Sequence, residues 1–171
     1  MRKVVTAATV NRLLEHLGRI AREPVRLYLT GGATALLHGW RTSTIDVDLC
    51  FEPEQDAIFR EIPAIKEALD LNIEFARPTD FIPEVPGWHE RSLFIGQFGK
   101  VAAYHTDPFS QALSKIERGH DQDIKDVREM FQRGLVRPAE MLQLFGLIEP
   151  ALYRYPAVDP PAFRRAVEKA C

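Results

Sequence analysis

Apolar and polar residues alternate along the first two thirds of the chain in patterns that predict both helices and strands. Apolar residues recur at helical spacing over residues 6–22, which predicts an amphipathic helix. A further helix is expected over 54–69, where Pro63 should kink it or divide it in two. Five short apolar or alternating runs predict strands at 25–30, 44–51, 71–76, 92–97 and 100–105.

After residue 107 the pattern becomes wholly helical. Helices are predicted at 108–118, 121–132, 138–147 and 160–169, with glycines and prolines at the breaks. The fold class is therefore α/β (α+β): a mixed β-sheet flanked by helices, followed by a C-terminal helical portion. No flexible linker separates residues 1–106 from residues 107–171, so we expect one folding unit with an α/β core and a helical portion packed on it.

The segment between Arg77 and Glu90 holds three prolines and has no periodicity, which predicts a loop. Loops of this length in compact domains are often functional. Its aromatic residues, Phe81 and Trp88, either cover a bound base or pack beneath the loop.

A glycine turn followed by two acidic residues is the main chemical signal. Gly31 and Gly32 follow the apolar run 25–29, where they allow the backbone to turn tightly and approach a ligand. In Asp46-Val47-Asp48 the acidic residues alternate with an apolar one, so both carboxylates should leave the same face of a strand. Paired carboxylates with substrate phosphates form the environment that Mg²⁺ prefers.

Two blocks of the sequence resemble the polymerase-β-type nucleotidyltransferase superfamily. Residues 30–49 resemble its glycine and D-x-D signature, and an Arg and a Thr ahead of the first Asp resemble AbiEii-type toxin nucleotidyltransferases and their bacterial relatives. Residues 112–127 are similar to the K…R…D…D helical motif of the same group. The resemblance implies a sheet that carries the metal site and helices that help to bind nucleotide or acceptor.

Nucleotidyl transfer by two metals requires a third carboxylate near Asp46 and Asp48. Glu74 is the first candidate, because it lies on a predicted strand with apolar neighbours on the opposite face. Relatives are expected to have Asp at that position. Asp80, in the proline-containing loop, is a second candidate, and Glu52 lies farther along the Asp48 strand, where it could only assist.

Cationic residues in the second block are candidate phosphate ligands. Lys115 and Arg118 lie three residues apart on one helix face, and the resemblance assigns Lys115 to the triphosphate. Asp123 and Asp126 are expected to order the helix pair by pairing with these cations or with Arg41; surface salt bridges are the alternative. Arg41 and Thr44 are candidate contacts for the γ-phosphate or for the entry to the acidic strand.

Composition narrows the class of protein. The net charge of −2 argues against a dedicated nucleic-acid clamp, although residues 1–41 carry seven Lys and Arg against two acids. That basic N-terminal region, with Arg2 and Lys3 ahead of its helix, could steer a phosphate-bearing partner or form a solvated face. Cys50 and Cys171 form no zinc or disulfide pattern. No apolar run is long enough to span a membrane, so a cytoplasmic protein without a membrane partner is expected.

These observations predict a small nucleotidyltransferase that uses Mg²⁺ or Mn²⁺ to transfer NMP from an NTP. The expected acceptor is an RNA 3′ end, such as that of tRNA, or a protein hydroxyl, and the resemblance suggests a toxin-antitoxin component with a cognate antitoxin. The alternatives are a non-catalytic module that binds a nucleotide or a protein, and transfer to a small molecule such as an aminoglycoside.

Overall fold

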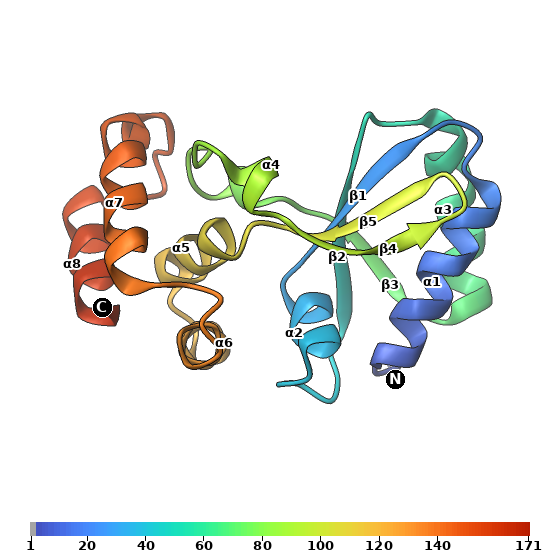
Figure 1. Ribbon diagram of the computed structural model, residues 1–171, viewed down its shortest axis with the longest axis horizontal. Coiled ribbons are helices and arrows are strands. Elements are labelled where there is room, and N and C mark those ends of the chain that lie inside the picture. Colours follow the sequence, from blue (N-terminus) through green and yellow to red (C-terminus); the bar gives the residue numbers. More distant parts are fainter. Residues whose placement is uncertain (1–2) are drawn as a thin grey trace. The chain divides into compact units, whose positions relative to one another are not determined.

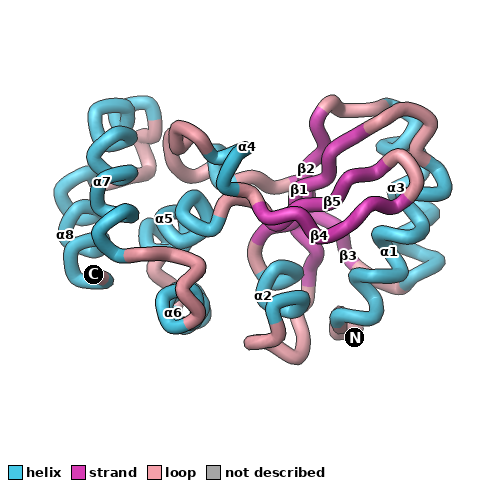
Figure 2. The backbone as a smooth tube through the Cα atoms, in the orientation of Figure 1, coloured by secondary structure: helices cyan, strands magenta, loops and turns pink. Residues whose placement is uncertain are grey.

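The computed structural model describes residues 3–171, which form two compact units (Figure 1). The first unit contains the chain up to Arg77 together with Leu93–His105, and the second contains Pro78–Ser92 and Thr106–Cys171. Arg2 of the predicted basic region lies outside the described residues. All five strands belong to the first unit, whereas the second consists of helices and loops (Figure 2).

The first unit is a mixed five-stranded sheet with three helices. The strands are ordered β3-β2-β1-β5-β4; β1 is antiparallel to β2 and parallel to β5, β2 is parallel to β3, and β4 is antiparallel to β5. Its elements are α1 (Ala7–Ile20), β1 (Val25–Thr30), α2 (Gly32–His38), β2 (Asp46–Glu52), α3 (Asp56–Leu69), β3 (Asn72–Phe75), β4 (Leu93–Phe98) and β5 (Val101–His105).

One apolar face of the sheet forms the core of this unit. Thr6 caps α1, since its hydroxyl accepts a hydrogen bond from the Thr9 N–H, and Val10, Leu13, Leu14 and Leu17 of the helix are buried. The alternate residues Val47, Leu49 and Phe51 of β2 belong to the same buried cluster. Because side chains alternate across a strand, Asp46 and Asp48 are directed to the opposite face.

The second unit is built from helices. Its elements are η1 (Pro78–Asp80), α4 (Trp88–Arg91), α5 (Pro108–Arg118), α6 (Asp121–Gln132), α7 (Pro138–Ile148), η2 (Glu149–Arg154) and α8 (Pro160–Ala170). Asp107 caps α5, since its carboxylate accepts hydrogen bonds from the N–H groups of Phe109 and Ser110. Pro108 occupies the first turn of α5, where its missing N–H costs no helical hydrogen bond.

Residues 78–92 pack with the helical unit although they lie between strands in the sequence. Arg91 donates to both carboxylate oxygens of the fully buried Asp107, at 3.1 Å from Nε and 2.7 Å from Nη2. The Tyr155 hydroxyl donates to the carbonyl of Thr79 at 2.9 Å. Ile82 and Val85 are buried. The segment that was expected to be a loop is thus partly ordered as η1 and α4, and it contributes apolar side chains to a core.

The predicted fold class is confirmed: a mixed sheet is flanked by helices and followed by helices. All five predicted strands and the predicted helices are present, with ends that differ by at most two residues. The division of the 54–69 helix at Pro63 is wrong, because α3 runs from Asp56 to Leu69 through Pro63 without a break. A proline removes one helical hydrogen bond, and the buried Ile58, Ile62 and Ile65 stabilise the helix across that position.

Candidate functional site

The turn between β1 and α2 brings the backbone close to an acidic side chain. Gly31 has φ 63° and ψ −132°, a conformation that L side chains rarely adopt. A Cβ atom there would lie 2.7 Å from Oδ2 of Asp48. The register agrees, because Thr30 is the partner of Asp48 across β1 and β2. Only glycine therefore allows this approach of the turn to the Asp48 carboxylate.

Gly32 makes room for two side chains that were predicted to bind nucleotide. A Cβ atom on Gly32 would lie 2.1 Å from Oγ1 of Thr44 and 3.3 Å from Nη1 of Arg41. Thr44 is held in place by backbone hydrogen bonds with Val5 at 2.8 and 3.0 Å. The four residues predicted around the glycine turn, Gly31 included, are thus gathered at one place.

An acidic face extends across β2 and β3. Asp46 is in register with Asn72, and Asp48 with Glu74, so these four side chains project from the same face of the sheet. The Asn72 amide Nδ2 donates to Asp46 Oδ1 at 2.8 Å and to Glu74 Oε1 at 3.1 Å. The structure therefore places Glu74 beside the two predicted aspartates, and Asn72 joins the carboxylates of Asp46 and Glu74.

The acidic face offers oxygen ligands of the kind that hard divalent cations take. Asp46 is half-buried, Glu74 is exposed, and neither forms an ion pair within residues 3–171. Over the same residues, no three His, Cys, Asp or Glu side chains are already gathered as a metal-ligand set. The donor chemistry fits Mg²⁺ or Mn²⁺, and Asp46, Asp48 and Glu74 are the residues that would hold it.

The other two candidate acids lie elsewhere. Glu52 ends β2, where it is paired with Arg26. It lies four residues beyond Asp48 along the strand. Asp80 is in η1, in the second unit. Neither has the cross-strand register with Asp48 that Glu74 has.

A pair of histidines lies at the end of β5 in the first unit. The rings of His38 and His105 stack with centroids 4.2 Å apart, and Nδ1 of His105 lies 3.3 Å from the Thr34 hydroxyl. Burial, with a smaller contribution from His38, lowers the pKa of His105 to about 3. His105 is therefore neutral at physiological pH and contributes no positive charge to the first unit.

The predicted cations of the second block form a buried ion cluster in the second unit. Nζ of Lys115 lies 2.8 Å from Oδ2 of Asp126 and 3.4 Å from Oδ1 of Asp123, and Nη2 of Arg118 lies 2.7 Å from the latter oxygen. The predicted pairing of these aspartates with Lys115 and Arg118 is confirmed. The Lys115 side chain is 5% exposed and that of Arg118 is 36% exposed. The Arg118 guanidinium also lies over the ring of Phe81, 5.3 Å from its centroid.

A family model described as a nucleotidyltransferase of unknown function (DUF6036) matches residues 8–143. The chain belongs to this family. No curated protein and no solved structure matches it significantly. The match to the nucleotidyltransferase family includes the glycine turn, the acidic face and the ion cluster on α5 and α6, and it ends within α7. It supports nucleotidyl transfer as the general activity.

Two residues around the acidic face and the glycine turn were not singled out from the sequence. In residues 72–74 two polar side chains flank an apolar one, as they do in residues 46–48. This repeated alternation is the signal that could have identified Asn72. Thr34, which contacts His105, has no comparable signal in the sequence.

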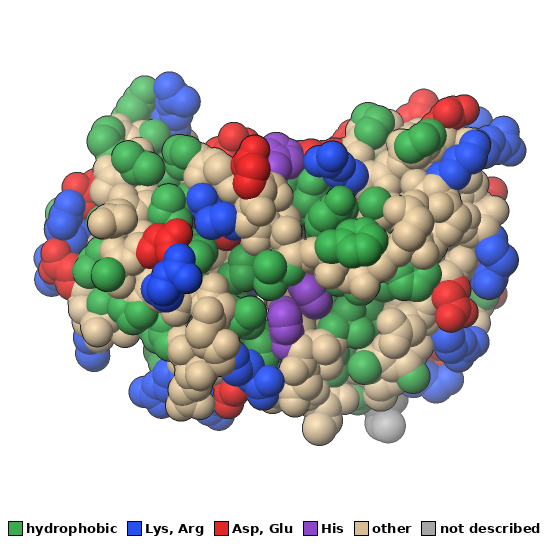
Figure 3. All heavy atoms as spheres, viewed as in Figure 1, with side chains coloured by type: hydrophobic (Ala, Val, Ile, Leu, Met, Phe, Trp, Pro, Cys, Tyr) green, Lys and Arg blue, Asp and Glu red, His purple; other side chains and the backbone are tan. Residues whose placement is uncertain are grey.

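Charged side chains are dispersed on the face of the described residues drawn in Figure 3, where Lys and Arg are scattered among apolar and acidic groups. That face does not carry the continuous basic stripe typical of a nucleic-acid clamp. Among residues 3–171, no helix has both the length and the apolar character that crossing a bilayer requires.

Proposed function

We propose that this nucleotidyltransferase moves an NMP group from an NTP to a hydroxyl acceptor, and that the reaction depends on Mg²⁺ or Mn²⁺. The acidic face is the observation that carries the proposal. Three carboxylates lie on one face of β2 and β3, two of them in direct cross-strand register, beside a glycine turn that only glycine can form. This combination supports a site for a metal-bound triphosphate.

Nucleotidyl transfer requires the protein to position the phosphates and to neutralise their charge. A divalent cation held by Asp46, Asp48 and Glu74 would neutralise phosphoryl oxygens and lower the pKa of the attacking hydroxyl. Gly31 and Gly32 carry no side chain, which allows the turn to lie close to Asp48, Thr44 and Arg41. The Arg41 guanidinium beside Gly32 supplies a cation that can pair with a terminal phosphate.

The assignment of Lys115 and Arg118 to the triphosphate stays a prediction. Lys115 is enclosed by two carboxylates, so its first role is to hold α5 against α6. Arg118 is the more exposed cation, and its guanidinium has donors beyond the one that contacts Asp123. Of the two cations, Arg118 is the more accessible to a phosphate.

One observation favours a second function, that of a non-catalytic binding module. The Asn72 amide lies between Asp46 and Glu74, where it satisfies both carboxylates without a cation. A protein that retained this arrangement would bind a nucleotide or a protein partner without transferring NMP. The two functions differ in their need for Glu74.

For the acceptor we propose an RNA 3′ end, such as that of tRNA, or a protein hydroxyl, in the setting of a toxin-antitoxin pair. The support is the resemblance of residues 30–49 to AbiEii-type toxins. Under this proposal, controlled expression of the wild type arrests bacterial growth, whereas the Asp48→Asn variant does not. Equal growth with both proteins would contradict the toxin role but not NMP transfer.

Titration calorimetry with ATP or CTP, in the presence and absence of Mg²⁺, tests the metal-dependent site. The wild type should bind the triphosphate only in the presence of the cation. Asp46→Asn or Asp48→Asn should abolish this cation-dependent binding. Glu61→Gln, a change at an exposed acid on α3, is the matched control and should bind as the wild type does. Equal binding by all four proteins would contradict the proposed site.

A further inference from the structure

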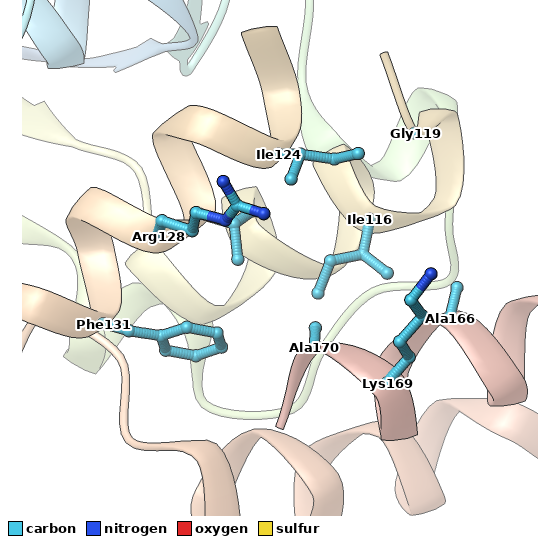
Figure 4. Close-up of a pocket in the computed structure, with 9 residues that line it drawn as sticks. Ile116, Gly119, Ile124, Arg128, Phe131, Ala166, Lys169 and Ala170 are labelled. Carbon is cyan, nitrogen blue, oxygen red and sulfur yellow. The ribbon is translucent and has the colours of Figure 1, made fainter. Parts of the chain in front are cut away.

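A pocket in the second unit is lined by none of the residues assigned to nucleotidyl transfer. It has a volume of about 380 Å³ and opens between α5, α6 and α8 (Figure 4). Volumes of roughly 300–1,000 Å³ are usual for small-molecule sites. Its lining residues are Ile116, Gly119, Ile124, Val127, Arg128, Phe131, Ala166, Lys169 and Ala170.

The interior of the pocket is apolar. Ile116 of α5 and Phe131 of α6 project toward its centre in Figure 4, and the small Ala166 and Ala170 of α8 leave the space open. Ile124 is 43% exposed at the mouth, which is high for an isoleucine in a helix that packs against another. An apolar body that entered the pocket would remove this surface from water and gain free energy in proportion to the area covered.

Two cations stand on opposite sides of this apolar space. Figure 4 shows the Arg128 guanidinium extending from α6 and the Lys169 side chain from α8. Neither forms a salt bridge or hydrogen bond within residues 3–171, and no acid lines that part of the pocket. Two arginines on or next to these helices are paired, Arg133 with Glu129 and Arg164 with Glu168. The two uncompensated cations favour an anionic group at the mouth.

We propose that this pocket binds a small amphipathic organic anion, with an apolar body against Ile116 and Phe131 and an acidic group between Arg128 and Lys169. Three of the lining residues, on α8, lie outside the part of the chain that matches the nucleotidyltransferase family. The site is thus distinct from the proposed transfer chemistry. A carboxylate on a chain of about eight carbons would place its apolar part in the pocket and its charge between the cations.

Titration calorimetry of the full chain with octanoate and with octan-1-ol tests the proposal, because the two probes share an apolar chain and differ in charge. The wild type should bind octanoate at least about tenfold more tightly than octanol, as expected for a charge-assisted contact. The double variant Arg128→Gln/Lys169→Gln should lose that preference while its octanol affinity is unchanged. Lys125→Gln/Arg165→Gln removes two exposed cations from the same helices outside the pocket, and it should bind octanoate as the wild type does.

The variant Ala170→Trp, which fills the pocket from the end of α8, should abolish binding of both probes while circular dichroism remains that of the wild type. Octanoate bound no more tightly than octanol would overturn the proposal. So would an unchanged preference in the Arg128→Gln/Lys169→Gln variant, or octanoate binding that survives the tryptophan. ATP binding is independent of all these results, so its loss or retention tests the proposed function separately.

Discussion

The molecule contains two groups of carboxylates, and they differ in what surrounds them. On the acidic face of β2 and β3, Asp46 is half-buried and Glu74 is exposed, and the two are joined through the neutral amide of Asn72. In the ion cluster of the second unit, Asp123 and Asp126 are buried and contact Lys115, with Arg118 also on Asp123. The first group has negative charge that a ligand could neutralise, whereas the second is neutralised by the protein itself.

The difference separates binding from stability. A buried charge must keep its partner, because removing the partner leaves an uncompensated charge in a medium of low dielectric constant. Replacing an exposed carboxylate changes the protein's free energy of unfolding little, since water already solvates that group. We therefore expect substitutions of the buried Lys115, Asp123 or Asp126 to lower the free energy of unfolding strongly, and substitutions on the acidic face to change mainly ligand binding.

The largest effect is expected for Asp126→Ala, which leaves buried Lys115 with only its longer contact to Asp123. The free energy of unfolding should fall by about 3–5 kcal/mol. Asp46→Ala should change it by less than about 0.5 kcal/mol. Urea unfolding followed by circular dichroism measures both. Comparable losses for the two variants would erase the distinction between the groups.

A substitution in the glycine turn should affect both stability and ligand binding, because the turn contacts Asp48 on the acidic face. Gly31→Ala forces a side chain into a glycine-only conformation and against Oδ2 of Asp48, so we expect a loss of about 2–3 kcal/mol and weaker Mg²⁺-dependent ATP binding. Gly134→Ala is the control: its φ is +70° and nothing lies within 4 Å of its added Cβ. It should cost about 1 kcal/mol and leave ATP binding intact. ATP binding that survives Gly31→Ala would show that the turn does not form part of the site.

Asn72→Asp tests whether charge on the acidic face is available to a cation. The variant adds a fourth carboxylate to the acidic face and removes the amide donor, so Mn²⁺ affinity should rise by about tenfold, or 1.4 kcal/mol. Asn11→Asp on the exposed face of α1 adds the same charge elsewhere and should have no such effect. Electron paramagnetic resonance of free Mn²⁺ measures the affinity. An equal rise in both variants would indicate a general effect of net charge.

Arg118→Ala should have the smallest effect. We expect roughly three- to tenfold weaker binding of ATP with little change for AMP, because a charge-assisted contact to the terminal phosphates has no partner in the monophosphate. Lys125→Ala, an exposed cation of α6, is the control and should alter neither. Dissociation constants from calorimetry decide the matter. A uniform loss for both nucleotides would point to damage in the helix pair instead of a lost phosphate contact.

Local patterns in the sequence predicted the elements and much of the acidic face. Alternation with period two depends only on neighbouring residues, so Asp46 and Asp48 could be placed on one strand face without knowledge of the sheet. The proximity of Glu74 required the parallel register of β2 and β3, which periodicity does not contain. Asn72 was missed for the same reason, since an amide becomes part of the site only through its cross-strand neighbours.

The surroundings of Lys115 could not be read from its helix pattern. Spacing showed that Lys115 and Arg118 share a helix face, but the burial of Lys115 follows from the packing of α6 against α5. The partnership of residues 78–92 with the helices was equally hidden, because the bidentate contact of Arg91 with Asp107 joins residues sixteen positions apart. Contacts of this kind depend on tertiary structure. The same is true of α3, which continues through Pro63 because its buried isoleucines outweigh the tendency of proline to break a helix.

The central claim is that the exposed acidic face supports NMP transfer, and transfer of label from α-labelled NTPs tests it most directly. The purified protein, with Mg²⁺ or Mn²⁺ and each of the four nucleotides, would be incubated with RNA and protein from a cell lysate. Our account predicts labelling by the wild type that disappears with chelator, and a Glu74→Gln variant that binds ATP but transfers no label. Nucleotide binding without labelling by the wild type, for all four nucleotides, would contradict the enzyme function and favour the non-catalytic binding module.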